Sequence, residues 1–111
     1  MNKDLNKKFI TFDLLSFKSE IELEAFLKFD EGSIEQFYNK LKTVGCENVK
    51  ITRIWNKGET YKAMVVFIWK DGKKIKERNI IFNKFVQENK FWRQVVVKSE
   101  MFEAFLVQEL N

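Results

Sequence analysis

The sequence contains no histidine and no proline, and only one cysteine and four glycines among its 111 residues. Without histidine, the chain has no imidazole for a general base, a catalytic triad or a typical zinc site. The lone Cys46 excludes a disulfide within the chain and a cysteine-cluster metal site. The four glycines stand singly, so no glycine-rich phosphate-binding loop is present. Only carboxylates remain as candidates for acid-base chemistry or for binding a divalent cation.

A long apolar run is also missing, because nothing in the sequence reaches the roughly 18 residues that cross a bilayer. The first residues, MNKDLNKKFITFDLLSF, are cationic but lack the unbroken apolar centre of a signal peptide. We therefore expect a soluble, cytoplasmic chain, unless an export or anchor segment has been removed from it. No low-complexity stretch marks a domain boundary, so we expect residues 1–111 to form a single domain.

Apolar residues make up 45% of the chain and charged residues 32%, which is a globular balance. The formal net charge is +4, and the excess lies after residue 46, where 13 Lys and Arg stand against 8 Asp and Glu. This charge favours an acidic partner, such as nucleic acid, an anionic lipid surface or an acidic protein. A lysine-rich composition is equally typical of proteins from AT-rich genomes, so both explanations stay open.

Residues 33–45 carry the clearest helical pattern. Ser33 is placed to cap this helix and Gly45 to end it. Residues 19–32 fit a helix that starts with a Ser19 and Glu22 capping box, although their apolar residues also alternate as in a strand. We favour the helix there. Residues 8–17 fit a helix and a strand equally well.

After Gly45 the apolar period changes to two, which predicts strands. Residues 48–55 and 60–69 alternate and are rich in β-branched and aromatic side chains. Asp71-Gly72 is the standard signal for a two-residue hairpin turn, because both turn positions need positive φ. We therefore predict a third strand over residues 73–86 and a fourth over residues 91–97.

Residues 99–110 close the chain as a predicted amphipathic helix. Its apolar stripe suits packing on the sheet of the same chain, or docking on another subunit or partner. The residues of this candidate interface are Met101, Phe102, Phe105, Leu106 and Leu110.

The predicted hairpin sets aromatic side chains opposite cations. Such a surface could stack on bases and contact phosphates, which would make it a nucleic-acid or anion patch. Alternatively, the long cationic side chains lie over the rings and shield them from water, which is the interpretation that we favour. The residues of this candidate patch are Phe67, Trp69, Lys74, Lys76 and Arg78.

The remaining groups give little sign of catalysis. Cys46 has no histidine to activate it, so a buried, inert thiol is favoured. Asp13 and Glu77 lie among apolar residues and are the candidates for an inward-facing carboxylate. We expect no enzyme activity, no cofactor and no metal site. The other carboxylates considered are best explained as a solvated helix surface; they are Glu22, Glu24, Asp30, Glu31 and Glu35.

The stretch VKITRIWNKGETYKAMVVFIWKDGKKIKERNIIFNKFVQENKFWRQVVV, after a helical start and a short FDEG break, resembles the nuclear transport factor two-like (cystatin-like) superfamily. The resemblance covers about residues 19–98. It implies a sheet curled around a helix, with a pocket at the open end that is catalytic, ligand-binding or filled. The aromatic residues favour a filled pocket, and the export signal of small bacterial members is missing.

The expected architecture is therefore α+β, with a curved antiparallel sheet of about four strands wrapped on the N-terminal helix or helices and an additional C-terminal amphipathic helix. The favoured function is a non-catalytic assembly or regulatory module that is oligomeric, with self-association or another protein as the partner. The alternative is a small basic protein of phage or mobile-element type that binds nucleic acid or another anion through residues 65–82.

Overall fold

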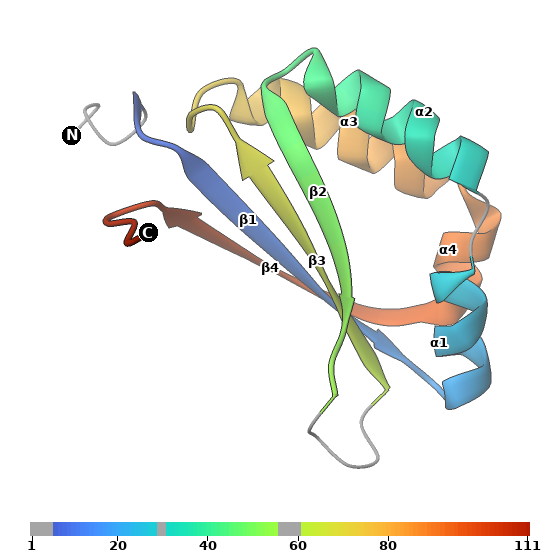
Figure 1. The fold of residues 1–111 in the computed structure, drawn as a ribbon. Coiled ribbons are helices and arrows are strands. Elements are labelled where there is room, and N and C mark those ends of the chain that lie inside the picture. The colour runs from blue at the N-terminus through green and yellow to red at the C-terminus, as the bar shows by residue number, and fades with distance from the viewer. Residues whose placement is uncertain (1–5, 29–30, 56–60) are drawn as a thin grey trace.

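The computed structural model describes residues 6–28, 31–55 and 61–111. It contains a four-stranded sheet and four helices (Figure 1). In chain order the elements are β1 (Phe9–Phe17), α1 (Glu20–Leu27), α2 (Glu31–Lys42), β2 (Cys46–Arg53), β3 (Lys62–Trp69), α3 (Ile75–Glu88), α4 (Lys90–Val95) and β4 (Val96–Phe105). None of the helices in the described residues combines the length and the apolar character needed to cross a membrane.

The sheet is antiparallel, with the strand order β2-β3-β1-β4. The two central strands, β1 and β3, are therefore the first and third in the sequence, and β4 returns from the end of the chain to pair with β1. Phe9 lies opposite Trp69 on one side and opposite Phe105 on the other. All four helices lie on one face of this sheet (Figure 1).

Strict alternation in the central strands divides the sheet into two faces. In β1 and β3 every second side chain is buried under the helices, whereas the side chains between them are only half-buried and lie on the opposite face. Aromatic contacts join the helices to one another, with Phe26 against Trp92 and Phe37 stacked on Phe85. Phe67 of β3 meets Phe82 of α3 and so joins the sheet to the helices. The buried apolar residues are Phe9, Leu15, Phe17, Leu23, Phe26, Leu41, Val44, Cys46, Ala63, Val65, Phe67, Trp69 and Val95.

The first half of the chain follows its sequence patterns closely. The helix expected over residues 19–32 is confirmed in part as α1, which ends at Leu27. Ser19 is its N-cap residue, but the Ser19 hydroxyl donates to the Glu22 carboxylate and makes no capping bond to the backbone, so the capping box is not formed. The helix expected over residues 33–45 is confirmed as α2, but it begins at Glu31 and so Ser33 is not its cap. Gly45 ends that region with φ +97°, a conformation that favours glycine. Residues 9–17, which fitted either element, form β1.

The strands expected at residues 48–55 and 60–69 are confirmed as β2 and β3, with Ala63, Val65, Phe67 and Trp69 on the buried face. Thr60, at the start of the second predicted strand, and the carboxylate Asp30 lie outside the described residues.

The hairpin at Asp71-Gly72 is wrong, because residues 75–88 form α3 rather than a third strand of a meander. Among the described residues, positive φ occurs at Gly45 and at Lys74 (φ 62°), and not at the two positions that a type I′ turn requires. The Asp71 carboxylate instead accepts a hydrogen bond from the Lys73 backbone N–H at 2.9 Å. This local bond turns the chain into the first turn of α3.

The end of the chain also differs from its sequence pattern. Residues 91–97 do not form one strand, because α4 occupies Lys90–Val95 and its first turn is capped by the Asn89 side chain. The C-terminal helix predicted over residues 99–110 is wrong as well, since residues 96–105 form β4. Pairing with β1 along its length stabilises this segment, whereas an isolated helix of the same length would be marginal in water. The sheet is thus not wrapped on N-terminal helices alone, because α3 and α4 cover the same face.

The helical state of residues 75–88 predicts a proline effect at Lys84, an exposed residue in the interior of α3. Lys84→Pro removes an intrahelical hydrogen bond and introduces a ring clash, so we expect the free energy of unfolding to fall by about 3 kcal/mol. Lys84→Ala is the matched control and should stay within about 0.5 kcal/mol of the wild type. Urea denaturation followed by circular dichroism measures both, and equal midpoints for the two variants would contradict a helix here.

Candidate ligand-binding cavity

A cavity of about 270 Å³ lies between α3 and the helix-covered face of β1, β3 and β4. Its wall combines aromatic and aliphatic side chains with several polar groups that converge on the same space. Cavities of this composition are the usual small-molecule sites of proteins, although about 300–1,000 Å³ is typical for larger ligands. The lining residues are Phe9, Thr11, Asp13, Trp69, Ile75, Arg78, Asn79, Phe82, Asn83, Val86, Ser99, Met101 and Glu103.

Asp13 is the buried carboxyl group of this cavity, with 5% of its surface exposed. It projects from the middle of β1, and the Ser99 hydroxyl of β4 donates a hydrogen bond of 2.5 Å to its Oδ1. Burial raises the pKa of Asp13 above 3.8, and the Ser99 bond lowers the pKa by a smaller amount. The protonated form of Asp13 is therefore accessible closer to neutral pH than that of an exposed aspartate.

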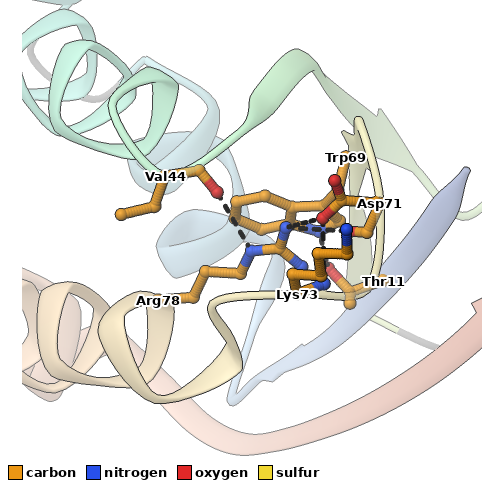
Figure 2. A network of polar contacts seen from close by, with 6 residues as sticks. All are labelled: Thr11, Val44, Trp69, Asp71, Lys73 and Arg78. Carbon is orange, nitrogen blue, oxygen red and sulfur yellow. Dashed lines mark hydrogen bonds and ion pairs between the residues drawn. The ribbon is translucent and has the colours of Figure 1, made fainter. Parts of the chain in front are cut away.

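Arg78 is the buried cation of the cavity, with 4% of its surface exposed. Its Nε donates to the Val44 carbonyl at 3.2 Å and its Nη2 donates to the Asp71 carbonyl at 2.7 Å (Figure 2). The guanidinium also lies over the Trp69 ring, 4.1 Å from the ring centroid. Desolvation lowers the pKa of Arg78 from its usual value, and the Asp71 carboxylate opposes this shift. An arginine still remains charged at any ordinary pH.

One nitrogen of Arg78 differs from the other two. Among the residues that the structure describes, the buried Nη1 has no hydrogen-bond partner. The bonds to Val44 and Asp71 fix the plane of the guanidinium, so Nη1 cannot turn toward another acceptor without breaking them. A buried donor without an acceptor is costly, and native proteins rarely keep one without a reason.

Trp69 and Thr11 complete the polar network at this end of the cavity. The Trp69 Nε1–H donates to Thr11 Oγ1 at 2.9 Å, and both residues are buried (Figure 2). The bond joins β3 to β1 below the guanidinium and fixes the indole plane on which Arg78 rests.

A second space of about 170 Å³ shares Asp13, Ser99, Phe82 and Val86 with the cavity. Its wall is otherwise almost entirely apolar, with aromatic side chains from α1, α2, α3 and α4. The two spaces therefore meet at Asp13, which stands between a polar end near Arg78 and a hydrophobic end beneath the helices. An amphipathic molecule suits this division.

The chemistry open to the cavity is limited. Cys46 is buried, as the sequence indicated, and burial raises the pKa of its thiol; it does not line the cavity. No cluster of three metal-ligating side chains occurs in the described part of the chain. Asp13 could hold or release a proton, and the Ser99 hydroxyl is hydrogen-bonded to it. The other lining residues include no histidine, cysteine or lysine that would complete a nucleophilic site. The arrangement is suited first to binding.

The candidate nucleic-acid patch is not assembled as one surface. Phe67, Trp69 and Arg78 are buried in the core, whereas Lys74 and Lys76 are exposed at the start of α3. The two rings cannot stack on bases from that position. The stacked cation that the sequence suggested does exist, but it is Arg78 on Trp69 inside the protein.

The candidate partner interface is split by the strand that replaces the predicted helix. Met101 and Phe105 lie on the helix-covered side, where Met101 lines the cavity and Phe105 meets Phe9 edge to face. Phe102 pairs with Phe12 on the opposite side and is 49% exposed. Leu106 and Leu110 follow β4, and Leu110 is exposed.

Of the two inward-facing carboxylates expected from the sequence, Asp13 is confirmed and Glu77 is wrong. Glu77 lies in the exposed first turn of α3, because the helix directs Arg78 rather than Glu77 toward the core. Sequence reasoning missed Arg78 as a core residue. The available signal was its helical spacing from Phe82 and Phe85, four and seven residues later.

The uncovered face of the sheet is a second candidate surface. Its centre is apolar across three strands, and no helix of the described chain lies over it (Figure 1). Lysines and a glutamate border this centre, including Lys50, Lys62 and the Lys98–Glu100 ion pair of 3.2 Å. The apolar side chains are Ile10, Phe12, Leu14, Met64, Val66, Ile68, Phe102 and Ala104.

The chain is similar to two solved structures described as dimeric ferredoxin-like proteins from uncultured marine organisms. One is 23% identical with a TM-score of 0.78, and the match covers 94% of this chain and 99% of that one. The other is 24% identical with a TM-score of 0.72 and coverage of 100% and 98%. SnoaB from Streptomyces nogalater, described as a cofactor-independent oxygenase, is 14% identical with a TM-score of 0.64 and coverage of 94% and 97%.

These likenesses show a ferredoxin-like fold, and they overturn the resemblance to the nuclear transport factor two-like (cystatin-like) superfamily. The physical reason is α3, which replaces the long strand that the resemblance needed. A comparison with curated proteins gives no significant match. A family model described as a domain of unknown function, DUF6974, matches residues 6–101.

The burial of Asp13 predicts a pH-dependent difference in stability. Because its pKa is raised in the folded state, Asp13 favours the fold most below pH 3.8, and this contribution is lost as the pH rises through the raised pKa. The side chain of the Asp13→Asn variant cannot ionise, so this variant avoids the loss. The free energy of unfolding of the variant minus that of the wild type should therefore increase as the pH rises from below 3.8 to neutral. Urea denaturation across that range measures the difference.

Ser99→Ala is the matched variant, because it removes the bond that lowers the pKa of Asp13. The loss of stability should then begin at the same pH as in the wild type, because the unfolded state sets the onset, but it should continue to a higher pH and be larger in total. A difference between Asp13→Asn and the wild type that does not change with pH would show that Asp13 has an ordinary pKa.

Proposed function

The chain belongs to the family described as a domain of unknown function, DUF6974, and we propose that it is a non-catalytic homodimeric module that binds a small, largely apolar molecule in each subunit. The observation that carries the proposal is the division of the sheet into two unlike faces. One face encloses a cavity with convergent polar groups, and the other presents an apolar centre that no element of the described chain covers.

A second copy of the chain is the occupant that best suits the uncovered face. The four strands lie about 4.8 Å apart, and each has about eight residues with a rise of about 3.3 Å per residue. One face of the sheet therefore covers roughly 500 Å² in projection, and the accessible area of its side chains is larger. A standard interface buries about 800 Å² from each partner. The apolar centre with a charged border has the composition of an interface, with Phe12 and Phe102 as its largest side chains.

The charges at the border suit self-association through a two-fold axis. Lys98 and Glu100 lie on the edge strand β4, and Lys50 lies on the opposite edge strand β2. A two-fold interface brings the same surface of both copies together, so cations and carboxylates of one copy can meet those of the other. The solved neighbours whose descriptions include the word dimeric support this proposal.

Binding in the helix-side cavity is the second part of the proposal. Arg78, Thr11 and Trp69 hold one another in fixed positions before any ligand arrives, which reduces the cost of ordering the site. Ser99 and Met101 belong to the edge strand β4, so this wall of the cavity lies at the border of the sheet.

We propose binding without turnover because the described cavity lining, although it includes Asp13, Ser99 and Glu103, has no histidine, cysteine or lysine to act with them. The alternative of a nucleic-acid-binding protein is not carried forward. Phe67 and Trp69, the aromatic residues of the candidate patch, are buried. Residues 65–82 do not form the hairpin that this alternative requires, because α3 begins at Ile75.

Dimerisation predicts a mass of twice the 13.4 kDa chain in size-exclusion chromatography with light scattering. Phe102→Asp places a carboxylate at the centre of the proposed interface, where it would be desolvated without a partner. We expect this variant to elute as a folded monomer, because Phe102 is already 49% exposed in the single chain.

Ile21→Asp is the matched control, since Ile21 is 80% exposed on α1, away from the uncovered face. It should remain dimeric. A monomeric wild type at micromolar concentration, or loss of the dimer in Ile21→Asp but not in Phe102→Asp, would rule out this interface.

A further inference from the structure

The polar end of the cavity contains a cation whose hydrogen-bonding capacity is only partly used. Nε and Nη2 of Arg78 donate to backbone carbonyls, and Nη1 is buried without a partner among the described residues. Arg78 lines the cavity, and only 4% of its surface is exposed to water. A ligand oxygen is the acceptor that this position lacks.

The charge at this end selects the kind of oxygen. Both acceptors already bound to Arg78 are neutral carbonyls, and the nearest carboxylate, that of Asp71, is 3.9 Å from Nη2. The Glu103 and Glu77 carboxylates attract the guanidinium more weakly than Asp71 does. The positive charge is therefore incompletely balanced at a position that is almost fully buried. A charged acceptor forms shorter and stronger hydrogen bonds with a guanidinium than a neutral one.

Two carboxyl groups of the protein also line the cavity, and they limit where an anion can sit. Asp13 already accepts a hydrogen bond from Ser99, and burial favours its protonated form, which can donate to a ligand. Glu103 belongs to the edge strand β4, where it is exposed to water. An anionic group is therefore best placed at Arg78, beside Thr11 and Trp69, rather than at the strand edge.

The rest of the wall selects the body of the ligand. Phe9, Phe82, Val86 and Met101 enclose the space beyond the guanidinium, and about 270 Å³ suits a body no larger than a substituted ring or a short aliphatic chain. We propose that the cavity takes a small organic monocarboxylate with an apolar body, its carboxylate bound to Arg78. This proposal rests on the proposed binding function and assigns its ligand class.

Benzoate is a suitable probe, with benzamide and benzyl alcohol as neutral probes of similar size. Binding can be followed by NMR through the Trp69 Nε1–H resonance, since the indole contacts both Arg78 and the cavity. We expect benzoate to bind more tightly than either neutral probe. Arg78→Gln should weaken benzoate binding by about tenfold or more, because a buried charge-assisted bond is lost.

Lys76→Gln is the matched control, because it removes the same charge from the same helix at an exposed position. It should leave benzoate affinity unchanged. If Arg78→Gln does not fold, Met101→Trp serves instead, since it fills the cavity without touching the bonds of Arg78. This variant should abolish binding of all three probes.

The outcomes separate the ligand class from the binding function. If the neutral probes bind as tightly as benzoate and Met101→Trp blocks them, the cavity binds ligands but the carboxylate assignment is wrong. If Lys76→Gln weakens benzoate binding as much as Arg78→Gln does, the attraction is general and the assignment is also wrong. If no probe perturbs the Trp69 resonance, the binding function itself fails.

Discussion

A single buried guanidinium joins the start of α3 to the end of β3 and to the segment that follows α2. Arg78 on α3 binds the carbonyl of Val44 at the end of α2 and the carbonyl of Asp71 after β3, while its planar face rests on Trp69. Gly45 lies beside this contact with φ +97°, a conformation that favours glycine, and a Cβ there would be in van der Waals contact with Arg78 Nη2 at 3.4 Å. The same contacts place α2 and α3 over the sheet, and they leave Arg78 facing the space that the helices enclose.

The two surfaces of functional interest follow from the alternation of β1 and β3. Odd-numbered residues such as Asp13 and Trp69 lie beneath the helices, and even-numbered residues such as Phe12 and Val66 lie on the uncovered side. Both sets are mainly apolar, so neither strand shows the polar side expected of a sheet exposed to water. A sheet of this kind favours a cover on both faces, and the part of the chain that the structure describes covers one of them (Figure 1).

Local patterns were enough to predict α2, β2 and β3 and to indicate that Asp13 faces inward, because each depends on neighbouring residues. They failed where a distant partner decides the outcome. Residues 96–105 carry apolar side chains at both helical and strand spacing, and only pairing with β1 selects the strand. Asp71-Gly72 favours a hairpin in isolation, but the buried contacts of Arg78 and Phe82 stabilise a helix after it. The cavity combines residues from β1, α3 and β4, so no single stretch of sequence contains its pattern.

The position of β1 has a consequence for how the two surfaces communicate. Phe12 and Asp13 are consecutive residues that point to opposite sides of a sheet one backbone thick. A twist of this strand that improves contact on one side therefore changes the spacing of groups on the other. If a bound ligand strengthens the association of two subunits, thermodynamic linkage requires that association strengthen ligand binding by the same free energy.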